Sequence, residues 1–143
     1  MTQDFTTATT EIAEVVAGIS GISAAPATPQ DNINERVFAF TYLYSSTTEI
    51  SETGTMMHLA TFFVDILTPR TNIGQNIAAL LPIVDLVDVA LVTEITTVSR
   101  FFDGSIDTYG NLRWEFIPVY PYSGKECVCY RAMLEDVKQK INL

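Results

Sequence analysis

The segment 36–44, RVFAFTYLY, is the part of the sequence that most restricts how the chain can fold. Its aromatic and β-branched residues favour a β-strand. Neighbouring residues of a strand point to opposite faces. Both faces are apolar here, with Val37, Ala39, Thr41 and Leu43 on one and Phe38, Phe40, Tyr42 and Tyr44 on the other. Such a strand has to be covered on both faces, by the rest of its domain or by a partner.

The chain around this strand has the size and composition of one folded domain. It contains 143 residues, of which 48% are hydrophobic and 17% charged, whereas disordered chains have the opposite balance. No internal repeat and no linker divides the chain. We therefore expect a single domain over residues 1–143.

The spacing of apolar residues predicts the elements near this strand. Residues 6–17 fit a first helix, which the loop 20–34 follows. Residues 55–67 fit a second strand, which should pair antiparallel with the first as a hairpin with a polar tip at 45–55. A central helix should then run from Thr71 or Asn72 to about Leu91, and Pro82 inside it predicts a kink or two short helices.

The last third of the chain is expected to be mainly strand. Residues 93–102 and 112–120 fit strands, while 126–143 fits a strand or a helix, and we favour a strand to about Asp136. The sequence thus predicts an α+β fold. It consists of a mixed, mainly antiparallel β-sheet flanked by an N-terminal helix and a central helix or kinked helix pair.

Charge and cysteine usage argue against several classes of protein. The chain has 8 Lys+Arg against 17 Asp+Glu and a net charge of −9, so stable binding to a DNA backbone is not expected. Cys127 and Cys129 are too close together for a disulfide framework, and no signal peptide is recognisable. The longest apolar stretch, 77–92, is interrupted by a proline and two aspartates, so we expect no membrane span and a cytosolic origin.

The residues that could carry chemistry do not form a recognisable catalytic set. His58 is the only histidine and is expected to be a surface or partly buried strand residue, because no orienting carboxylate and nucleophile accompany it. Cys127 and Cys129 should share one face of a strand and serve packing, because with His58 they still fall short of a zinc site.

Three aspartates in apolar surroundings have two interpretations each. Asp65 lies in the strand sequence FFVDILT and could be a catalytic carboxylate, but an outward-facing residue paired with a basic group is favoured. Asp85 and Asp88 lie one helical turn apart, and we expect both on the solvated face of the central helix rather than in a metal site. The sequence thus predicts no catalytic, cofactor-binding or metal-ligating residue, and a protein that is not an enzyme.

Several segments follow one another in an informative order. They are VAGISGISAAPATPQDNIN, then RVFAFTYLY, then a hairpin from Gly54 into a strand that holds His58 and ends at Arg70, then NIGQNIAALLPIVDLVDVAL with its Leu-Pro, and last a Tyr-Ser-Gly turn at 122–124. Over residues 11–141 this order resembles the tail-terminator (tail-completion) proteins of long-tailed bacteriophages. The resemblance implies a mixed sheet flanked by helices, and a ring, usually a hexamer, that caps the tail tube and ends its polymerisation.

The resemblance also implies partners and a location. The partners are other copies of the chain in a homo-oligomeric ring, the tail tube protein, and the head-closure or connector protein that docks on the ring. DNA passes through the lumen without specific binding, and no membrane, metal or cofactor is involved. The protein would be assembled in the host cytoplasm and reside in the tail or neck of the virion.

Acidic loops would suit such a lumen, because carboxylates repel DNA phosphates over about 8 Å at physiological salt. Glu49, Glu52, Asp103 and Asp107 are the candidates for lumen-lining or partner-contact residues, chosen by their position in expected loops. The hairpin tip 45–55 and the loop 20–34 are the candidate contact arms.

Three alternatives stay open. The first is another neck protein, such as a head-closure or stopper protein, although the helix at 72–91 argues against these smaller and more barrel-like proteins. The second is an enzyme whose site is built at a subunit interface, against which the missing nucleophile and base argue. The third is a soluble binding module for a cellular protein.

Overall fold

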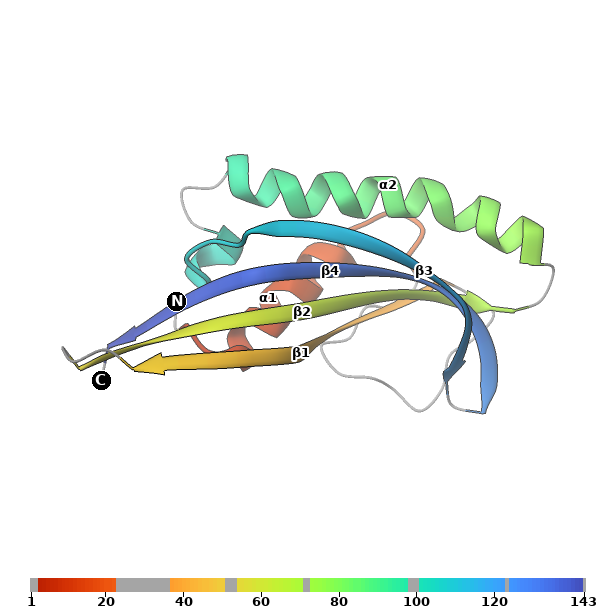
Figure 1. Ribbon diagram of the computed structural model, residues 1–143. Helices are drawn as coiled ribbons and strands as arrows, with labels where there is room; N and C mark the ends of the chain where they lie inside the picture. The colour runs from red at the N-terminus through yellow and green to blue at the C-terminus, as the bar shows by residue number, and fades with distance from the viewer. Residues whose placement is uncertain are drawn as a thin grey trace.

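The computed structural model of the chain describes residues 3–22, 37–50, 54–70, 73–97, 101–122 and 124–142. These residues form a four-stranded sheet of order β1-β2-β4-β3, in which every strand pair is antiparallel (Figure 1). Two helices pack on one face of this sheet, so the predicted α+β fold is confirmed, while the described sheet is purely antiparallel rather than mixed. The elements are α1 (Phe5–Ala17), β1 (Phe38–Ile50), β2 (Thr55–Pro69), α2 (Ile73–Thr97), the 3-10 helix η1 (Phe101–Gly104), β3 (Asn111–Tyr122) and β4 (Lys125–Asn142).

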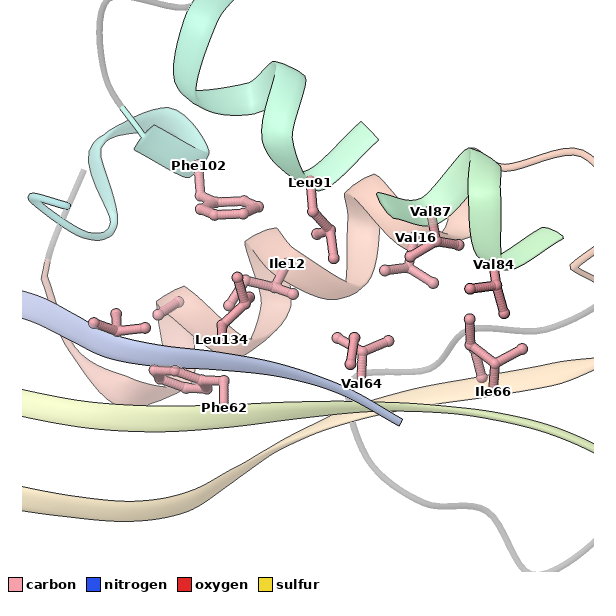
Figure 2. Packing of buried hydrophobic residues seen from close by; sticks show 14 of the residues in the cluster. Ile12, Val16, Phe62, Val64, Ile66, Val84, Val87, Leu91, Phe102 and Leu134 are labelled. Carbon is pink, nitrogen blue, oxygen red and sulfur yellow. The ribbon is translucent and has the colours of Figure 1, made fainter. Parts of the chain in front are cut away.

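The main core lies between the helices and one face of the sheet (Figure 2). Alternate residues of β2 point into it, because side chains of a strand alternate between its two faces. The core joins Ile12 and Val16 of α1, Val84, Val87 and Leu91 of α2, Phe62, Val64 and Ile66 of β2, Leu134 of β4 and Phe102 of η1. The opposite face of the sheet, which carries neither helix, is called here the free face.

Helix α1 begins where the sequence predicts it. The carboxylate of Asp4 accepts a hydrogen bond of 2.6 Å from the backbone N–H of Thr7, which caps the first turn. The same hydrogen bond holds the pKa of Asp4 below its ordinary value. Ala8, Ile12 and Val16 recur every four residues along the helix, so they share the side that packs in the core.

Helix α2 is one element of 25 residues and continues through Pro82, so the expectation of two short helices is wrong. A proline inside a helix frees the carbonyl four residues earlier, which here belongs to Ala78. Ala78 and Pro82 are both exposed, so that carbonyl lies on the side of the helix that faces water. The opposite side, with Leu80 and Val84, packs in the core and holds the helix together.

The structure corrects the expected strand at 93–102. Residues 93–97 are the last turn of α2, and Phe101–Gly104 is a 3-10 helix. The other expected strands are confirmed, including the last segment, which is a strand that continues past Asp136 to Asn142.

The expected hairpin tip at 45–55 is largely wrong. β1 continues to Ile50 and β2 begins at Thr55, and their residues pair in register from Ser45–Thr61 to Ile50–Met56. The Ser and Thr residues here extend the ladder because β-branched threonines fit a pleated strand. Residues 51–53 and most of the loop 20–34 lie outside the described residues.

A β-bulge lies near the middle of β4. Ala60 pairs with Val137 and Phe62 with Leu134, so Thr61 stands opposite both Glu135 and Asp136. Asp136 takes the left-handed conformation, with φ 56°. Gly110 approaches this bulge closely, since its N–H donates to the carbonyl of Glu135 at 2.9 Å.

We expect Gly110→Ala to destabilise the fold at this bulge. A Cβ atom at residue 110 would lie 2.9 Å from the Cβ of Asp136, which the backbone holds in place. Relief of that overlap requires a backbone shift that costs about 1–3 kcal/mol. Gly74→Ala is the matched control, because nothing lies within 4 Å of a Cβ there. The free energy of unfolding in urea should fall for the first variant and not for the second.

Candidate functional site

The free face of the sheet holds a buried ion pair between its two central strands. Asp65 of β2 is fully buried and stands directly opposite Arg131 of β4 in the ladder. The guanidinium donates from Nε to Oδ1 of Asp65 at 2.8 Å and from Nη2 to Oδ2 at 3.2 Å. Such bidentate pairing is the strongest geometry open to arginine and a carboxylate.

Two tyrosines from the outer strands complete the cluster. The hydroxyls of Tyr42 on β1 and Tyr120 on β3 each donate to Oδ2 of Asp65 at 2.9 Å. Phe63 lies under the guanidinium, with its ring centre 4.5 Å from Cζ of Arg131. All four strands therefore contribute a side chain to one polar group in an apolar setting.

The electrostatics of this cluster favour structure over proton transfer. Burial, with the nearby charge of Asp65, raises the pKa of both Tyr42 and Tyr120. The hydrogen bond with Asp65 raises the pKa of Arg131 further above its ordinary value. Hydroxyls and guanidinium therefore keep their protons at neutral pH and act as fixed donors. The predicted pairing of Asp65 with a basic group is confirmed, but its predicted outward position is wrong because the side chain is buried.

His58 lies in a second buried polar network, on the helix-covered face. Nε2 of Gln139 donates to the carbonyls of Asp4 at 2.8 Å and Ser105 at 2.9 Å, so Oε1 of Gln139 is left to accept. The ring nitrogen Nδ1 of His58 lies 3.1 Å from that Oε1 and must therefore carry the proton. The ring stacks on Phe5 at 4.2 Å. His58 thus ties α1 to the sheet, close to the expected role of a partly buried strand residue.

The two cysteines share one face of β4, as predicted. Cys127 and Cys129 are free and buried on the free face beside Phe38, Phe40 and Leu67. Burial raises the pKa of both thiols, so neither is a ready nucleophile or metal ligand. Among the described residues, no group of three or more His, Cys, Asp and Glu side chains could hold a metal ion.

The candidate lumen residues do not form one described site. Glu49 is exposed in strand β1 rather than in a loop, and exposed Asp107 accepts a hydrogen bond of 2.7 Å from Nε2 of Gln3. Glu52 lies outside the described residues. Asp103 belongs to η1, but its side chain is not among those described.

The two helical aspartates differ from each other. Asp85 is exposed, as predicted for a solvated face. Asp88 is half-buried and accepts a hydrogen bond of 2.8 Å from the indole N–H of Trp114, so that prediction is wrong for Asp88. This bond attaches α2 to the edge strand β3.

The side of α2 that points away from the sheet is apolar as well. Leu81, Leu86, Val89 and Val92 are 46%, 48%, 61% and 44% exposed. Over Gly74–Glu94 the helix is long and apolar enough to cross a membrane, judged by length and composition alone, so the expectation that no stretch reaches that length is wrong. We call these four residues, with Asp85 between them, the outer face of α2.

The outer face was not expected, because the spacing of apolar residues predicts a single stripe on this helix, formed by Ile73, Ile77, Leu80, Leu81, Val84, Val87 and Leu91. The signal was present, since Leu86, Val89 and Val92 fall between the residues of that stripe, whereas Leu81 was expected in the stripe and is instead 46% exposed. A helix that is apolar all round is normally buried on all sides. The outer face is therefore the strongest candidate for a functional surface in the part of the chain that the structure describes.

Comparison with protein-family models and with curated proteins found no match to this chain.

We expect Arg131→Leu to be strongly destabilising. It leaves the fully buried Asp65 carboxylate without its cation, and breaking a buried pair on one side costs about 3–5 kcal/mol. Arg113→Leu is the matched control. Its ion pair with Glu135 is largely exposed, at 59% and 30% of the side chains, and such a pair contributes about 1 kcal/mol or less. The free energy of unfolding in urea is the measurement, and an equal decrease in the two variants would contradict the larger contribution of the buried ion pair.

Alkaline pH should unfold the protein through the same cluster. The pKa values of Tyr42 and Tyr120 are raised in the folded state above the ordinary 10.0, so above that pH the folded chain binds more protons than the unfolded chain. The stability that these two hydroxyls contribute is therefore full below about pH 10 and is lost as pH rises beyond it. The free energy of unfolding, measured with a chemical denaturant at a series of alkaline pH values, should decline as the pH rises. In the double variant Tyr42→Phe with Tyr120→Phe, the free energy of unfolding should decline less steeply with pH. An unchanged pH dependence would contradict the assignment of the decline to these two hydroxyls.

Proposed function

We propose that this chain is a structural protein that assembles with copies of itself into a ring of the tail-terminator type, which caps a tail tube. The observation that carries the proposal is the apolar outer face of α2. Four large aliphatic side chains on one side of a folded domain are costly to leave in water, and they mark an interaction surface. A ring would cover them on every copy.

The fold and the composition also support this function. The ordered segments that resemble tail terminators imply a sheet flanked by helices, and the described fold is of that kind. The buried polar groups at Asp65 and His58 are each occupied by structural contacts, which leaves an enzyme mechanism without support from them. A net charge of −9 suits a lumen that lets DNA pass. The tail tube and the head connector are the further partners proposed.

A membrane helix is the main competing interpretation of α2. The inner side of α2, with Leu80, Val87 and Leu91, lies fully buried in the core between α1 and the sheet. Insertion of α2 into lipid would keep these residues out of water but would uncover the apolar residues of α1 and the sheet that they pack against, and each of those exposed to water would forfeit about 1.5–3 kcal/mol of burial. Covering the outer face by protein leaves the core intact, which favours self-assembly.

The proposed function is tested by the mass and the shape of the purified protein. Light scattering should give a multiple of the chain mass, and negative-stain images should show rings. Addition of these rings to growing tail tubes should stop elongation. A protein that stays monomeric both alone and with tubes, or that sediments with lipid vesicles without being denatured, would contradict the proposal.

One substitution tests the outer face itself. Val89→Asp places a charge at the most exposed of its aliphatic positions, and we expect it to weaken assembly by about tenfold or more while the fold is kept. Val119→Asp is the matched control, because Val119 is 44% exposed but lies on β3. Light scattering over a dilution series should separate the two variants, whereas an equal effect would argue against α2 as the contact.

A further inference from the structure

The sheet has two edges, and β1 forms one of them (Figure 1). In the second half of β1, Tyr44–Ile50, all seven residues are exposed, and Ser45–Ile50 pairs with β2 residue by residue. Within the described ranges, the backbone of this half bonds to no element other than β2. An edge strand turns every second N–H and C=O to the outside. This half of β1 is therefore able to take up one more strand.

The exposed half of β1 has little protection against such pairing. Proteins usually block their sheet edges with prolines, lysines or other charges. The stretch Tyr44–Ile50 has no proline, lysine or arginine, and Glu49 is its one charged residue. Its threonines favour the strand conformation, and Ile50 is 78% exposed. An open edge of this composition marks an interaction surface, because in water it would pair with other chains.

The other edge, β3, is closed over its second half only. Pro118 and Pro121 have no N–H to donate, and the ladder to β4 shifts register at this point. The carbonyl of Pro118 already accepts a hydrogen bond of 3.1 Å from Nε of Arg70. The first half, Asn111–Ile117, pairs with β4 without interruption, and none of its residues is buried. In the part of the chain that the structure describes, each edge of the sheet thus has one open stretch.

The directions of the strands fit a head-to-tail contact between copies. Neighbouring strands alternate in direction across the sheet, so β1 and β3 run in opposite directions within one copy. Where the sheet of one copy continues into the sheet of the next, β3 of the first copy meets β1 of the second in the antiparallel sense. The added pair therefore repeats the pattern of the pairs within each copy.

The two open stretches lie at different levels of the sheet. Arg113 on β3 is level with Tyr42 on β1, as the registers across β4 and β2 show. The open stretch of β1 begins beyond Tyr42, so two copies pair only when they are displaced along the strands. Such a stagger tilts every strand, and a sheet closes on itself only when its strands are staggered and tilted. The offset between the two stretches therefore favours a closed ring over a flat sheet.

We propose that the open stretch of β1, Tyr44–Ile50, pairs antiparallel with the open stretch of β3, Asn111–Ile117, of the next copy. This inference rests on the proposed ring and names the contact between its copies. With Glu49 opposite Arg113, no two like charges stand directly opposite each other, which would be destabilising. Head-to-tail contacts of this kind close into a ring when the rotation between copies allows it, and otherwise give a filament.

Proline substitution on the two edges tests the pairing. Successive residues of an antiparallel strand turn their N–H groups to opposite sides, so one member of each neighbouring pair points its N–H outward. The variants are Thr47→Pro and Thr48→Pro on β1, and Glu115→Pro and Phe116→Pro on β3. In each pair, the outward variant should keep its fold and associate about tenfold more weakly, because proline has no N–H to donate to an added strand.

Val119→Pro is the matched control for these variants. Residue 119 lies where the β3 ladder is interrupted, so this substitution should leave association unchanged. Sedimentation velocity measures self-association, in solution and on tail tubes. Circular dichroism and urea unfolding identify the variant in each pair that keeps the fold of the unaltered chain.

Cysteine cross-linking identifies which edges meet. Within one copy, residues 49 and 113 are three strand spacings apart, about 14 Å, and about 20 Å apart along the strands, so a short bismaleimide cannot join them. The double variant Glu49→Cys with Arg113→Cys should therefore give covalent chains of copies on a denaturing gel. A mixture of the two single variants should give linked pairs, and each single variant alone should give none. The unaltered chain, whose two cysteines are buried, is the control for reactivity.

The outcomes separate this inference from the proposed function. Rings that form without cross-links in the double variant, or that persist in folded proline variants at all four positions, would overturn the edge contact and leave the ring intact. Links between copies of the Glu49→Cys single variant would show that β1 pairs with β1, and would also overturn the contact. Cross-linked filaments in place of rings would support the contact and overturn the ring. An unaltered chain that is monomeric in solution and on tubes would overturn both.

Discussion

The contact between Asp65 and Arg131 is the interaction on which the rest of this fold depends. It joins the two central strands at directly opposite positions, so a shift of β4 by one residue would move Arg131 to the helix-covered face and leave a buried carboxylate unpaired. Because Tyr42 and Tyr120 bind the same carboxylate, the outer strands are positioned by it as well. The cost of a misplaced charge thereby specifies the register of the whole sheet, which in turn sets which residues face the helices.

That register explains how much of the fold could be predicted. Alternation and helical spacing act locally, and they located α1, the hairpin strands and β3 correctly. The turn that ends α2 was missed because its β-branched residues favour a strand by propensity, while the packing of Leu91 in the core keeps the helix going. The burial of Asp65 was missed because its partner Arg131 lies 66 residues away in the sequence, and no local sequence pattern indicates that the two meet.

The candidate site was predictable only in part. The sequence indicated that no catalytic set stands out, but it chose candidate contact residues by their position in expected loops, and of these Glu49 lies in strand β1 and Asp103 in the 3-10 helix η1. The apolar residues of the outer face of α2 can be read from the sequence. Only the packing of Leu80, Val84 and Val87 in the core shows which side of the helix stays exposed. Whether an apolar side chain is exposed depends on the tertiary packing around it, which the spacing of residues in the sequence does not give.

The net charge of the chain sets a condition on the proposed assembly. With a net charge of −9, free copies repel one another at distances up to the Debye length, about 8 Å at physiological salt. At contact, burial of the exposed aliphatic side chains of α2 favours association of the proposed copies. Long-range repulsion and short-range attraction together favour assembly on a surface that holds copies close together, such as the end of a tube, over aggregation of free copies in solution.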